Sequence, residues 1–597
     1  MDTIPSRFAR QASLLPDKPL FLVNRGGSYQ SLPWKQAHEA ITALSLFFLD
    51  QQIKPGDRVL ILSENRPEWG IADVAIQSVG AWTVPIYPTL TANDLEMIGR
   101  DCEPVFAVTS TTEQAGKLLE VCRAAPSLRG IVVIEPSAQA DPRIQSWSAA
   151  LSRGRDAAAH LVPELERRLA AIHSEDTATL LYTSGTTGEP KGVMLSHRNL
   201  LSNVDACLKV IPIGPQDVHL SFLPLSHVFE RMAGWYLMFS VGASVAYAQS
   251  MDTLPQDMVA VRPTVMLGVP RFFEKLYARI QEGLQHAPPL QRRIAEWAFG
   301  VGRTATGYLT SGRPLPLRLA WQRHLAQMLV YRKLQARLGG RLRFFVSGSA
   351  PLSKDIGAFF YSAGVTILEG YGLTETSPVI AANRLPAPRF GTVGPALPGV
   401  DVRIAEDGEI LTRGPHVMQG YYRKPDATAA AIVDGWFHTG DIGHVDAEGN
   451  LVITDRKKDL IKTAGGKFVA PQKLENAFVM DPAISQAFVY GDRRPYCVAL
   501  IVPNQEQMRR YAREQGIPAM ALSELVRDPR VVAWYWVRVQ AKQAGFASFE
   551  QVKKIALLDA EFSQAAGELT PTLKAKRSVI AQRYAALLDR LYEASLP

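Results

Sequence analysis

Segments typical of strands and of helices alternate along this chain up to about residue 390. A strand-like stretch at 57–63 (DRVLILS) precedes a helix-like segment at 65–80 (NRPEWGIADVAIQSVG) and a second strand-like stretch at 82–88 (WTVPIYP). The alternation returns at 341–372 (RLRFFVSGSAPL, SKDIGAFFYSAG, VTILEGYG), where Ser353 stands at a helix N-cap position. This pattern predicts parallel α/β units, which build a large doubly wound core with its ligand crevice at the carboxyl ends of the strands.

The pattern changes after residue 390 to short strands and turns: GTVGPALPGVDVRI, GEILTRGPHVM and GNLVITD. These segments predict a small β-rich subdomain. The charged segment 455–459 (DRKKD) then interrupts, and a new series of strands and helices follows. A chain of 597 residues is expected to hold two or more domains. We predict an N-terminal domain of residues 1–455 and a small α+β C-terminal domain of residues 456–597.

Composition excludes several classes of protein. Hydrophobic residues make up 47% of the chain and charged residues 20%, which is typical of a folded globular protein. The four cysteines are scattered without a CxxC spacing, so neither a disulfide framework nor a zinc site is predicted. We therefore expect a reducing, intracellular location. The first residues lack the basic start, apolar stretch and cleavage site of a secretion signal.

The uncharged run Met232 to Met251 is long enough for a membrane-spanning helix to be considered. Glycine and polar residues interrupt it, among them Gly234, Ser240 and Gly242. We predict instead a buried helix that leads into a core strand, with a spanning helix as the alternative.

The formal net charge of +8 is unevenly distributed. Residues 456–597 contain 22 Lys and Arg against 14 Asp and Glu, whereas the preceding residues are balanced. Within the balanced part, residues 271–343 contain 14 basic and 3 acidic residues. Such surpluses suit anionic small molecules or an anionic membrane surface, although solvated helix faces have the same composition. No aromatic nucleic-acid-binding motif accompanies the basic residues, so a nucleic-acid partner is not expected.

The segment 182–192 (YTSGTTGEPKG) follows an apolar, strand-like stretch. It is not a Walker A loop, because Pro190 and Gly192 occupy the positions that require glycine and a hydroxyl residue. Glycine backbone N–H groups, hydroxyl donors and a lysine still predict phosphate binding, with a flexible turn as the alternative. The groups concerned are Thr183, Ser184, Gly185, Thr186, Thr187, Gly188 and Lys191.

This loop resembles the phosphate loop of the adenylate-forming superfamily, which includes acyl-CoA synthetases, luciferases and peptide-synthetase adenylation domains. Five further segments resemble the remaining motifs in the expected order: PLSHVFER (224–231), GYGLTETSP (370–378), GWFHTGD (435–441), DRKKDLIKTAGGKFVAP (455–471) and LTPTLKAKR (569–577). Several of these forms are most similar to long-chain fatty acyl-CoA synthetases. The resemblance covers nearly the whole chain and implies the α/β fold predicted above, with a mobile C-terminal domain.

The resemblance implies which residues bind ATP and Mg²⁺. Glu375 and Thr183 are expected to hold the metal, because hard carboxylate and hydroxyl oxygens suit Mg²⁺. Asp441 has two acceptor oxygens for a ribose diol, and Arg456 is expected beside the ribose or the α-phosphate. The expected adenine pocket comprises Ser349, Ala350, Tyr371, Gly372 and Thr374.

The resemblance implies that the final motif supplies a catalytic lysine to the adenylation step. Aligning Thr572 with the threonine of the motif makes Lys576 this lysine, although Lys574 and Ala575 then stand where Ser-Gly is usual. Lys574 therefore remains the alternative. The resemblance also implies that the C-terminal domain rotates between half-reactions about a hinge at Lys458. Rotation would bring in Gly465 and Gly466, which leave room for the pantetheine arm of CoA.

His227 is expected beside the acyl carboxylate, together with the catalytic residues Lys191, Glu375 and Lys576. Some relatives place an aromatic gate four residues after this histidine, where this chain has Arg231. Residues of the run 232–251 are candidates to line an acyl tunnel, although core packing explains them equally well.

These features predict an enzyme that converts ATP, a long-chain fatty acid and CoA into acyl-CoA, AMP and pyrophosphate. We expect it in the cytoplasm, with peripheral contact at the inner face of the membrane. Two alternatives remain open: a ligase that loads a carrier protein or uses another class of acid, and a catalytically silent lipid-binding protein on the same fold.

Overall fold

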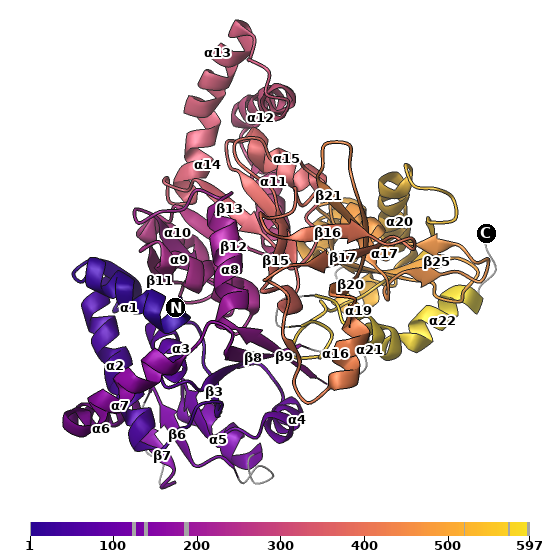
Figure 1. The fold of residues 1–597 in the computed structure, drawn as a ribbon. Coiled ribbons are helices and arrows are strands. Elements are labelled where there is room, and N and C mark those ends of the chain that lie inside the picture. Colours follow the sequence, from indigo (N-terminus) through magenta and orange to yellow (C-terminus); the bar gives the residue numbers. More distant parts are fainter. Residues whose placement is uncertain are drawn as a thin grey trace.

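The computed structural model of the chain describes residues 2–121, 127–135, 141–183, 190–518, 520–570 and 574–593. Two eight-stranded sheets form the N-terminal part, followed by a five-stranded sheet and a separate C-terminal α+β part (Figure 1). Each eight-stranded sheet is parallel at its centre and antiparallel toward an edge. The predicted α/β class and the β-rich subdomain are confirmed.

The first large sheet has the order β15 (Val379–Ala382), β14 (Ile367–Gly372), β13 (Phe344–Ser347), β12 (Val265–Gly268), β10 (Val218–Ser221), β11 (Ser244–Tyr247), β1 (Pro19–Arg25), β2 (Ser28–Pro33). The second has the order β18 (Gly420–Tyr421), β9 (Lys191–Ser196), β8 (Thr177–Thr183), β4 (Trp82–Ile86), β3 (Arg58–Leu62), β5 (Phe106–Thr109), β6 (Gly130–Val133), β7 (Ile144–Ser146).

The five-stranded sheet contains β16 (Asp401–Ile404), β17 (Glu409–Arg413), β20 (Trp436–Val445), β19 (Ile432–Val433) and β21 (Leu451–Arg456). The helical elements of the first 431 residues are α1 (Ile4–Leu14), α2 (Trp34–Asp50), α3 (Pro67–Ser78), α4 (Ala92–Cys102), α5 (Thr112–Val121), α6 (Trp147–Asp156), α7 (Ala158–Ala171), α8 (His197–Leu208), η2 (Glu230–Tyr236), α9 (Leu237–Ser240), α10 (Leu254–Val261), α11 (Pro270–Gln285), α12 (Pro289–Thr310), α13 (Leu317–Ala326), η3 (Gln327–Tyr331), α14 (Arg332–Arg337), α15 (Lys354–Ser362), η4 (Thr374–Thr376) and α16 (Pro425–Ala431).

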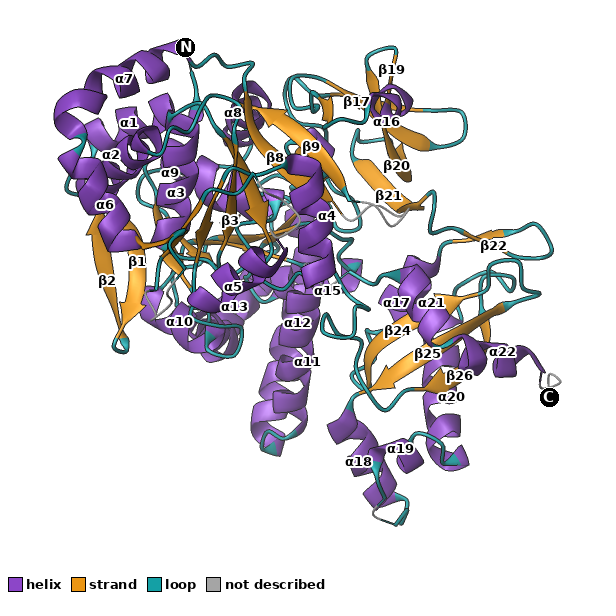
Figure 2. Cartoon of the chain, turned by 90° about the horizontal axis from the view of Figure 1, so that it is seen from below, coloured by secondary structure: helices purple, strands orange, loops and turns teal. Residues whose placement is uncertain are grey.

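The C-terminal part has its own core, which begins at Ile461. Its strands are β22 (Ile461–Lys462), β23 (Phe468–Val469), β24 (Ile484–Tyr490), β25 (Cys497–Pro503) and β26 (Val552–Leu557). Its helices are α17 (Pro471–Phe478), α18 (Gln505–Glu514), α19 (Leu522–Leu525), α20 (Pro529–Gln543), α21 (Arg577–Arg583) and α22 (Ala585–Glu593). Helices flank the three-stranded sheet β24-β25-β26, as Figure 2 shows.

One apolar core joins the two large sheets. It contains Phe21 and Val245 from the first sheet together with Val59 and Val108 from the second. Every residue of α3 is buried except Glu68, because this helix belongs to the shared core. The strands and helices predicted at 57–88 and 341–372 appear as β3, α3, β4, β13, α15 and β14, so these predictions are confirmed.

One local prediction needs a correction. Helix α15 begins directly after Ser353, as expected, but the Ser353 hydroxyl makes no cap hydrogen bond. It donates instead to Sδ of Met480 in the C-terminal part, at 3.3 Å. The hydroxyl of Ser353 therefore contacts the neighbouring part of the chain rather than a helix N–H group.

The run 232–251 folds as the rest of the π-helix η2, then α9 and the core strand β11. All seven residues of η2 are buried. The predicted buried helix leading into a core strand is thus confirmed. Among the described residues, we find no helix with the length and apolarity needed to cross a bilayer.

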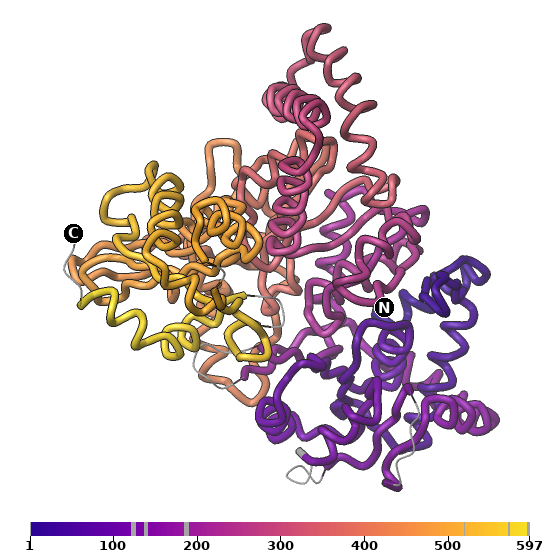
Figure 3. Tube along the Cα trace, turned by 180° about the vertical axis from the view of Figure 1, so that it is seen from behind, coloured from indigo at the N-terminus to yellow at the C-terminus, as the bar shows by residue number. Residues whose placement is uncertain are grey.

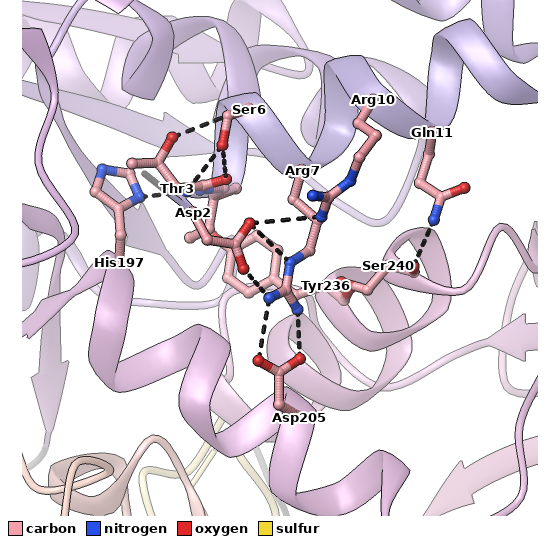
Figure 4. Close-up of polar contacts among 11 residues, drawn as sticks. Asp2, Thr3, Ser6, Arg7, Arg10, Gln11, His197, Asp205, Tyr236 and Ser240 are labelled. Carbon is pink, nitrogen blue, oxygen red and sulfur yellow. Dashed lines mark hydrogen bonds and ion pairs between the residues drawn. The ribbon is translucent and has the colours of Figure 1, made fainter. Parts of the chain in front are cut away.

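Helix α1 is held in place by polar contacts with two other elements (Figure 4). Arg7 bonds Asp2 on one side and donates to Asp205 of α8 at 2.7 Å on the other. The amide of Gln11 donates to the carbonyl of Ser240 at the end of α9, at 2.7 Å. These contacts attach the start of the chain to α8 and α9.

A buried ion pair links the helices between the two sheets. Arg231 of η2 donates from Nε to Asp73 of α3 at 3.2 Å and from Nη1 to Thr179 of β8 at 2.6 Å. Tyr236 also donates to Asp73, at 2.8 Å. The side chains of Arg231 and Asp73 are 1% and 0% exposed. Each charge is therefore compensated by hydrogen bonds in a place that water does not reach.

We expect Asp73→Ala to lower the free energy of unfolding by about 3–5 kcal/mol, because it leaves Arg231 buried without its partner. Urea unfolding followed by tryptophan fluorescence measures the change. The matched control is Glu175→Ala, which breaks the exposed pair of Arg198 and Glu175 and should cost less than about 1 kcal/mol. Equal losses of unfolding free energy in Asp73→Ala and Glu175→Ala would contradict the claim that the buried ion pair matters more for stability than the exposed one.

Candidate active site

A large cavity of about 1870 Å³ lies where the large sheets, the five-stranded sheet and the C-terminal part meet. The residues that line it come from segments far apart in the sequence, including β9, β14, β20, β21 and residues from 569–570 and 574–581. The predicted site residues among them are Thr183, Lys191, His227, Ser349, Ala350, Tyr371, Gly372, Thr374, Glu375, Asp441, Arg456, Lys458 and Lys576. The fold thus brings most of the predicted set to one place.

Two groups of predicted residues are not found in this cavity. Ser184, Gly185, Thr186, Thr187 and Gly188 lie outside the described residues. Gly465 and Gly466 are exposed in the turn between β22 and β23 and do not line the cavity. The C-terminal part therefore presents residues from 569–570 and 574–581, rather than this glycine turn, to the other site residues.

Asp441 is the centre of a polar cluster at the cavity wall. Tyr371 of β14 donates its hydroxyl to Asp441 Oδ2 at 2.8 Å, and Arg456 donates from Nε to Oδ1 at 3.1 Å. Asp441 and Arg456 are also paired residues of β20 and β21. Desolvation raises the pKa of Asp441, while the charge of Arg456 and the Tyr371 hydroxyl oppose this rise. Asp441 therefore stays oriented, with acceptor capacity for a diol.

A second carboxylate, Glu375 of η4, lies on the same cavity wall. Tyr421 donates to its Oε1 at 3.0 Å, whereas Oε2 makes no hydrogen bond within the described residues. The ammonium group of Lys191 lies 4.9 Å from the centre of the Tyr421 ring. Tyr421 thus positions both the carboxylate and the cation. Sequence reasoning did not identify Tyr421, which β18 places beside β9.

Backbone geometry fixes two residues of the expected adenine pocket. Ser349 has a left-handed conformation with φ 70°, which costs a non-glycine residue about 1–3 kcal/mol and is typical of functional sites. At Gly372 a Cβ atom would lie 1.7 Å from the carbonyl oxygen of Pro378, so only glycine fits there. Both residues line the cavity beside Tyr371.

His227 is neutral and has a defined tautomer. Desolvation, with the positive charge of Lys574 as a smaller cause, lowers its pKa to about 3. The backbone N–H of Phe229 donates to Nδ1 at 3.2 Å, so the proton of the neutral ring is on Nε2. His227 can therefore donate one hydrogen bond from Nε2.

The structure distinguishes the two candidate lysines of the final motif. Lys574 keeps exposed surface within the cavity. Desolvation by the surrounding protein lowers its pKa to about 8, the charge of Arg456 adds to this, and Asp441 and Glu375 oppose it. The side chain of Lys576 makes no hydrogen bond or ion pair within the described residues, and its backbone N–H donates to the Glu568 carbonyl at 2.8 Å. Of the two, Lys574 is thus the lysine that interacts with the carboxylates.

An apolar set of side chains lines the cavity near His227. It consists of Cys207, Ile211, Ile213, Val228, Phe229, Met232, Ala233, Leu237, Leu267 and Val269. Part of the run 232–251 therefore has the expected lining position, whereas Trp235 packs on Phe8 and Phe21. Arg231 is absent from the lining because it bonds Asp73. Within this apolar set the aromatic side chain is that of Phe229, which lies against Gly348.

Glu369, immediately before the GYG segment, is a further group that sequence reasoning missed. It lines the cavity and is 7% exposed. Desolvation raises its pKa to about 8, although the backbone N–H groups of Gly391 and Leu352 oppose the rise. No sequence motif identifies Glu369, because its raised pKa results from its burial in the folded chain.

Taken together, the cavity combines cations, two carboxylates with free acceptor capacity and an apolar region. Lys191, Arg456 and Lys574 provide positive charge. Such an arrangement can hold a polyphosphate and a carboxylate near each other and reduce their mutual repulsion. The described residues contain no group of three or more His, Cys, Asp or Glu that could hold a metal ion on their own.

Comparisons with known proteins agree with this geometry. The family described as "AMP-binding enzyme" matches residues 8–422, and "AMP-binding enzyme C-terminal domain" matches residues 458–596. "Long-chain-fatty-acid--CoA ligase FadD15" of Mycobacterium bovis is 38% identical over 97% of this chain and 95% of its own. "Long chain acyl-CoA synthetase 6, peroxisomal" of Arabidopsis thaliana is 33% identical over 95% of this chain and 82% of its own.

Solved structures support the fold. The adenylation domain of a carboxylate reductase from Mycobacterium chelonae has a TM-score of 0.76 at 24% identity, covering 99% of this chain and 91% of that chain. ATP-bound MatB from Rhodopseudomonas palustris has a TM-score of 0.69 at 24% identity, covering 98% and 100%.

The lowered pKa of Lys574 predicts unusual amine reactivity. A pKa of about 8, against an ordinary value of 10.5, makes the amine half neutral near pH 8. The acylation rate of Lys574 should therefore reach its midpoint near that pH, because the neutral amine is the nucleophile. Mass spectrometry after pulse labelling across a pH series measures the rate, and exposed Lys35 serves as the reference. A midpoint for Lys574 no lower than that of Lys35 would contradict the prediction.

Proposed function

We propose that this chain, which belongs to the AMP-binding enzyme family, is a long-chain fatty acid–CoA ligase. It joins the acid to AMP with release of pyrophosphate, then transfers the acyl group to CoA. The names of its full-length relatives support this substrate class. The observation that carries the proposal is one cavity in which Asp441, Glu375 and Lys574 lie near neutral His227 and an apolar wall.

The nucleotide is held mainly by the large N-terminal part. Asp441 accepts the ribose hydroxyls, Arg456 keeps this carboxylate charged, and Tyr371 lies beside the adenine. The phosphates bind to Lys191 and to the loop of residues 183–188. The remaining adenine contacts come from Ser349, Ala350, Gly372 and Thr374.

Mg²⁺ fits beside the phosphates. Glu375 has an oxygen without a hydrogen-bond partner among the described residues, and Thr183 lines the same cavity. One carboxylate, one hydroxyl and substrate phosphate oxygens form a usual set of ligands for this ion. When bound, Mg²⁺ would neutralise part of the negative charge on the phosphates.

Adenylation requires a carboxylate to approach the α-phosphate, although both are anionic. We assign the bridging cation to Lys574 in preference to Lys576, because Lys574 interacts with Asp441 and Glu375. Its charge offsets the repulsion between the reacting groups. His227 donates from Nε2 to the acyl carboxylate, which keeps this group oriented for attack on phosphorus.

Thioester formation needs space for a thiol at the same carbonyl. The C-terminal part then rotates about Lys458, so that Lys574 leaves and Gly465 and Gly466 approach. The absence of side chains at these glycines leaves a passage for pantetheine. Both glycines are exposed and outside the cavity, and we assign this arrangement to the adenylation step.

Long-chain acids partition into bilayers. We therefore place the enzyme in the cytoplasm, in peripheral contact with the inner face of the membrane.

Paired substitutions test the assignment of the lysine. Lys574→Ala should reduce fatty-acid-dependent pyrophosphate exchange by about 10²–10³-fold, whereas Lys576→Ala should stay within about threefold of the parent. CoA thioester formation from supplied acyl-adenylate should persist in both variants, because this step occurs after the lysine has left. The opposite order of losses would return the role to Lys576, and absence of exchange in the parent with every acid tried would overturn the function.

The apolar wall predicts how chain length is selected. Ala233→Phe should lower kcat/KM for palmitate while octanoate changes little, since the added ring takes space from the distal methylenes. Losing contact with two methylenes costs about 1.6 kcal/mol, or about fifteenfold. Steady-state assays with acids of graded length measure the ratio, and octanoate turnover reports on folding. Equal losses for both acids would contradict a tunnel at Ala233.

A further inference from the structure

Residues 289–337 form a helical arm that projects from the N-terminal part. The arm comprises α12, α13, η3 and α14, and α12 and α13 extend beyond the sheets at the top of Figures 1 and 3. It follows directly on α11, whose first residues Pro270, Arg271, Glu274 and Lys275 line the active-site cavity. The arm is therefore connected to the cavity wall by one continuous helix.

The arm is strongly basic. Its 49 residues contain nine Lys and Arg but a single acidic residue, Glu296. Within the part of the chain that the structure describes, only Arg292 of these nine forms an ion pair, with Glu296. Arg318, Arg332 and Lys333 are exposed. Internal ion pairing thus does not account for this charge.

Large apolar side chains are exposed along the same arm. Leu317 is 91% exposed, Trp321 64% and Met328 43%. With His324 they are spaced by four, three and four residues, which puts them on one face of a helix. Leu329 beside them is 46% exposed. A soluble surface rarely exposes a tryptophan and several aliphatic side chains together, unless they meet a partner.

We propose that this arm docks on an anionic lipid bilayer, with Leu317 and Trp321 entering the interfacial layer. The charge is complementary, because the arm carries a surplus of eight positive charges and anionic headgroups attract such segments. A tryptophan among arginines on a protruding helix is typical of interfacial anchoring, since its ring is apolar and its N–H group polar. An acidic protein groove would match the charge but would not require the apolar residues to protrude so far.

The arm's position also suits the chemistry, and in this respect the inference rests on the proposed function. A long-chain acid resides in the bilayer, and α11 connects the arm to the cavity that would receive it. Docking at the arm would hold the cavity near the source of the substrate.

Vesicle flotation of the full chain tests the proposal independently of turnover. Vesicles of phosphatidylcholine alone are compared with vesicles that also contain phosphatidylglycerol, at low and at high salt. The arm variants are L317S/W321S and R318E/R332E. The matched controls are L14S/F549S, which removes exposed apolar groups elsewhere, and R509E/R513E on α18, which reverses exposed charges elsewhere. Circular dichroism confirms that each variant is folded.

We expect binding to anionic vesicles that high salt weakens. Each arm variant should lose at least about tenfold in partitioning, since a single basic residue contributes about fivefold, and the controls should match the parent. Equal binding to both kinds of vesicle, or equal loss in arm and control variants, would overturn the proposal. So would arm variants that dissociate an oligomer in light scattering but leave vesicle binding unchanged. Loss of acyl-CoA formation with intact vesicle binding would instead refute only the proposed function.

Discussion

The buried pair of Arg231 and Asp73 determines how the two large sheets are held together. It joins η2 to α3, and Thr179 of β8 completes the set of hydrogen bonds. The adjacent residue, Glu230, is fixed in the other direction by His219 of β10, at 2.7 Å. Because both contacts are fully buried, η2 can occupy only one position. His227, three residues before the start of this helix, and the cavity-lining residues within it acquire their positions from these contacts.

The charged residues of the active-site cavity do not form one buried pair but come from separate parts of the chain. Around the cavity, cations belong to separate parts of the chain: Lys191 to a large sheet, Arg456 to the five-stranded sheet and Lys574 to the C-terminal part. No single element carries the full positive charge, so moving one part alters the electrostatics of the whole site. A chain that must first neutralise phosphates and then admit a thiol benefits from this division.

Much of this architecture is predictable from the sequence, because strong local patterns and ordered motifs identify the strands, the helices and most cavity residues. The choice between Lys574 and Lys576 cannot be predicted from the sequence, because Thr570 and Lys574 have the same spacing as Thr572 and Lys576. Desolvation within the cavity and neighbouring carboxylates distinguish Lys574, and both arise only after folding. The ion pair between Arg231 and Asp73 could not be predicted from the sequence either, because the two residues are 158 positions apart.

Helix η2 has no solvent-facing side, so few of its residues can be substituted without loss of stability. All seven residues of η2 are buried, and two of them, Glu230 and Arg231, carry charges whose partners lie on other elements. Most replacements there would leave a void, a clash or an orphaned charge. Substitutions that change the preferred acyl chain are therefore expected at the few positions of this helix whose side chains line the cavity, such as Met232 and Ala233.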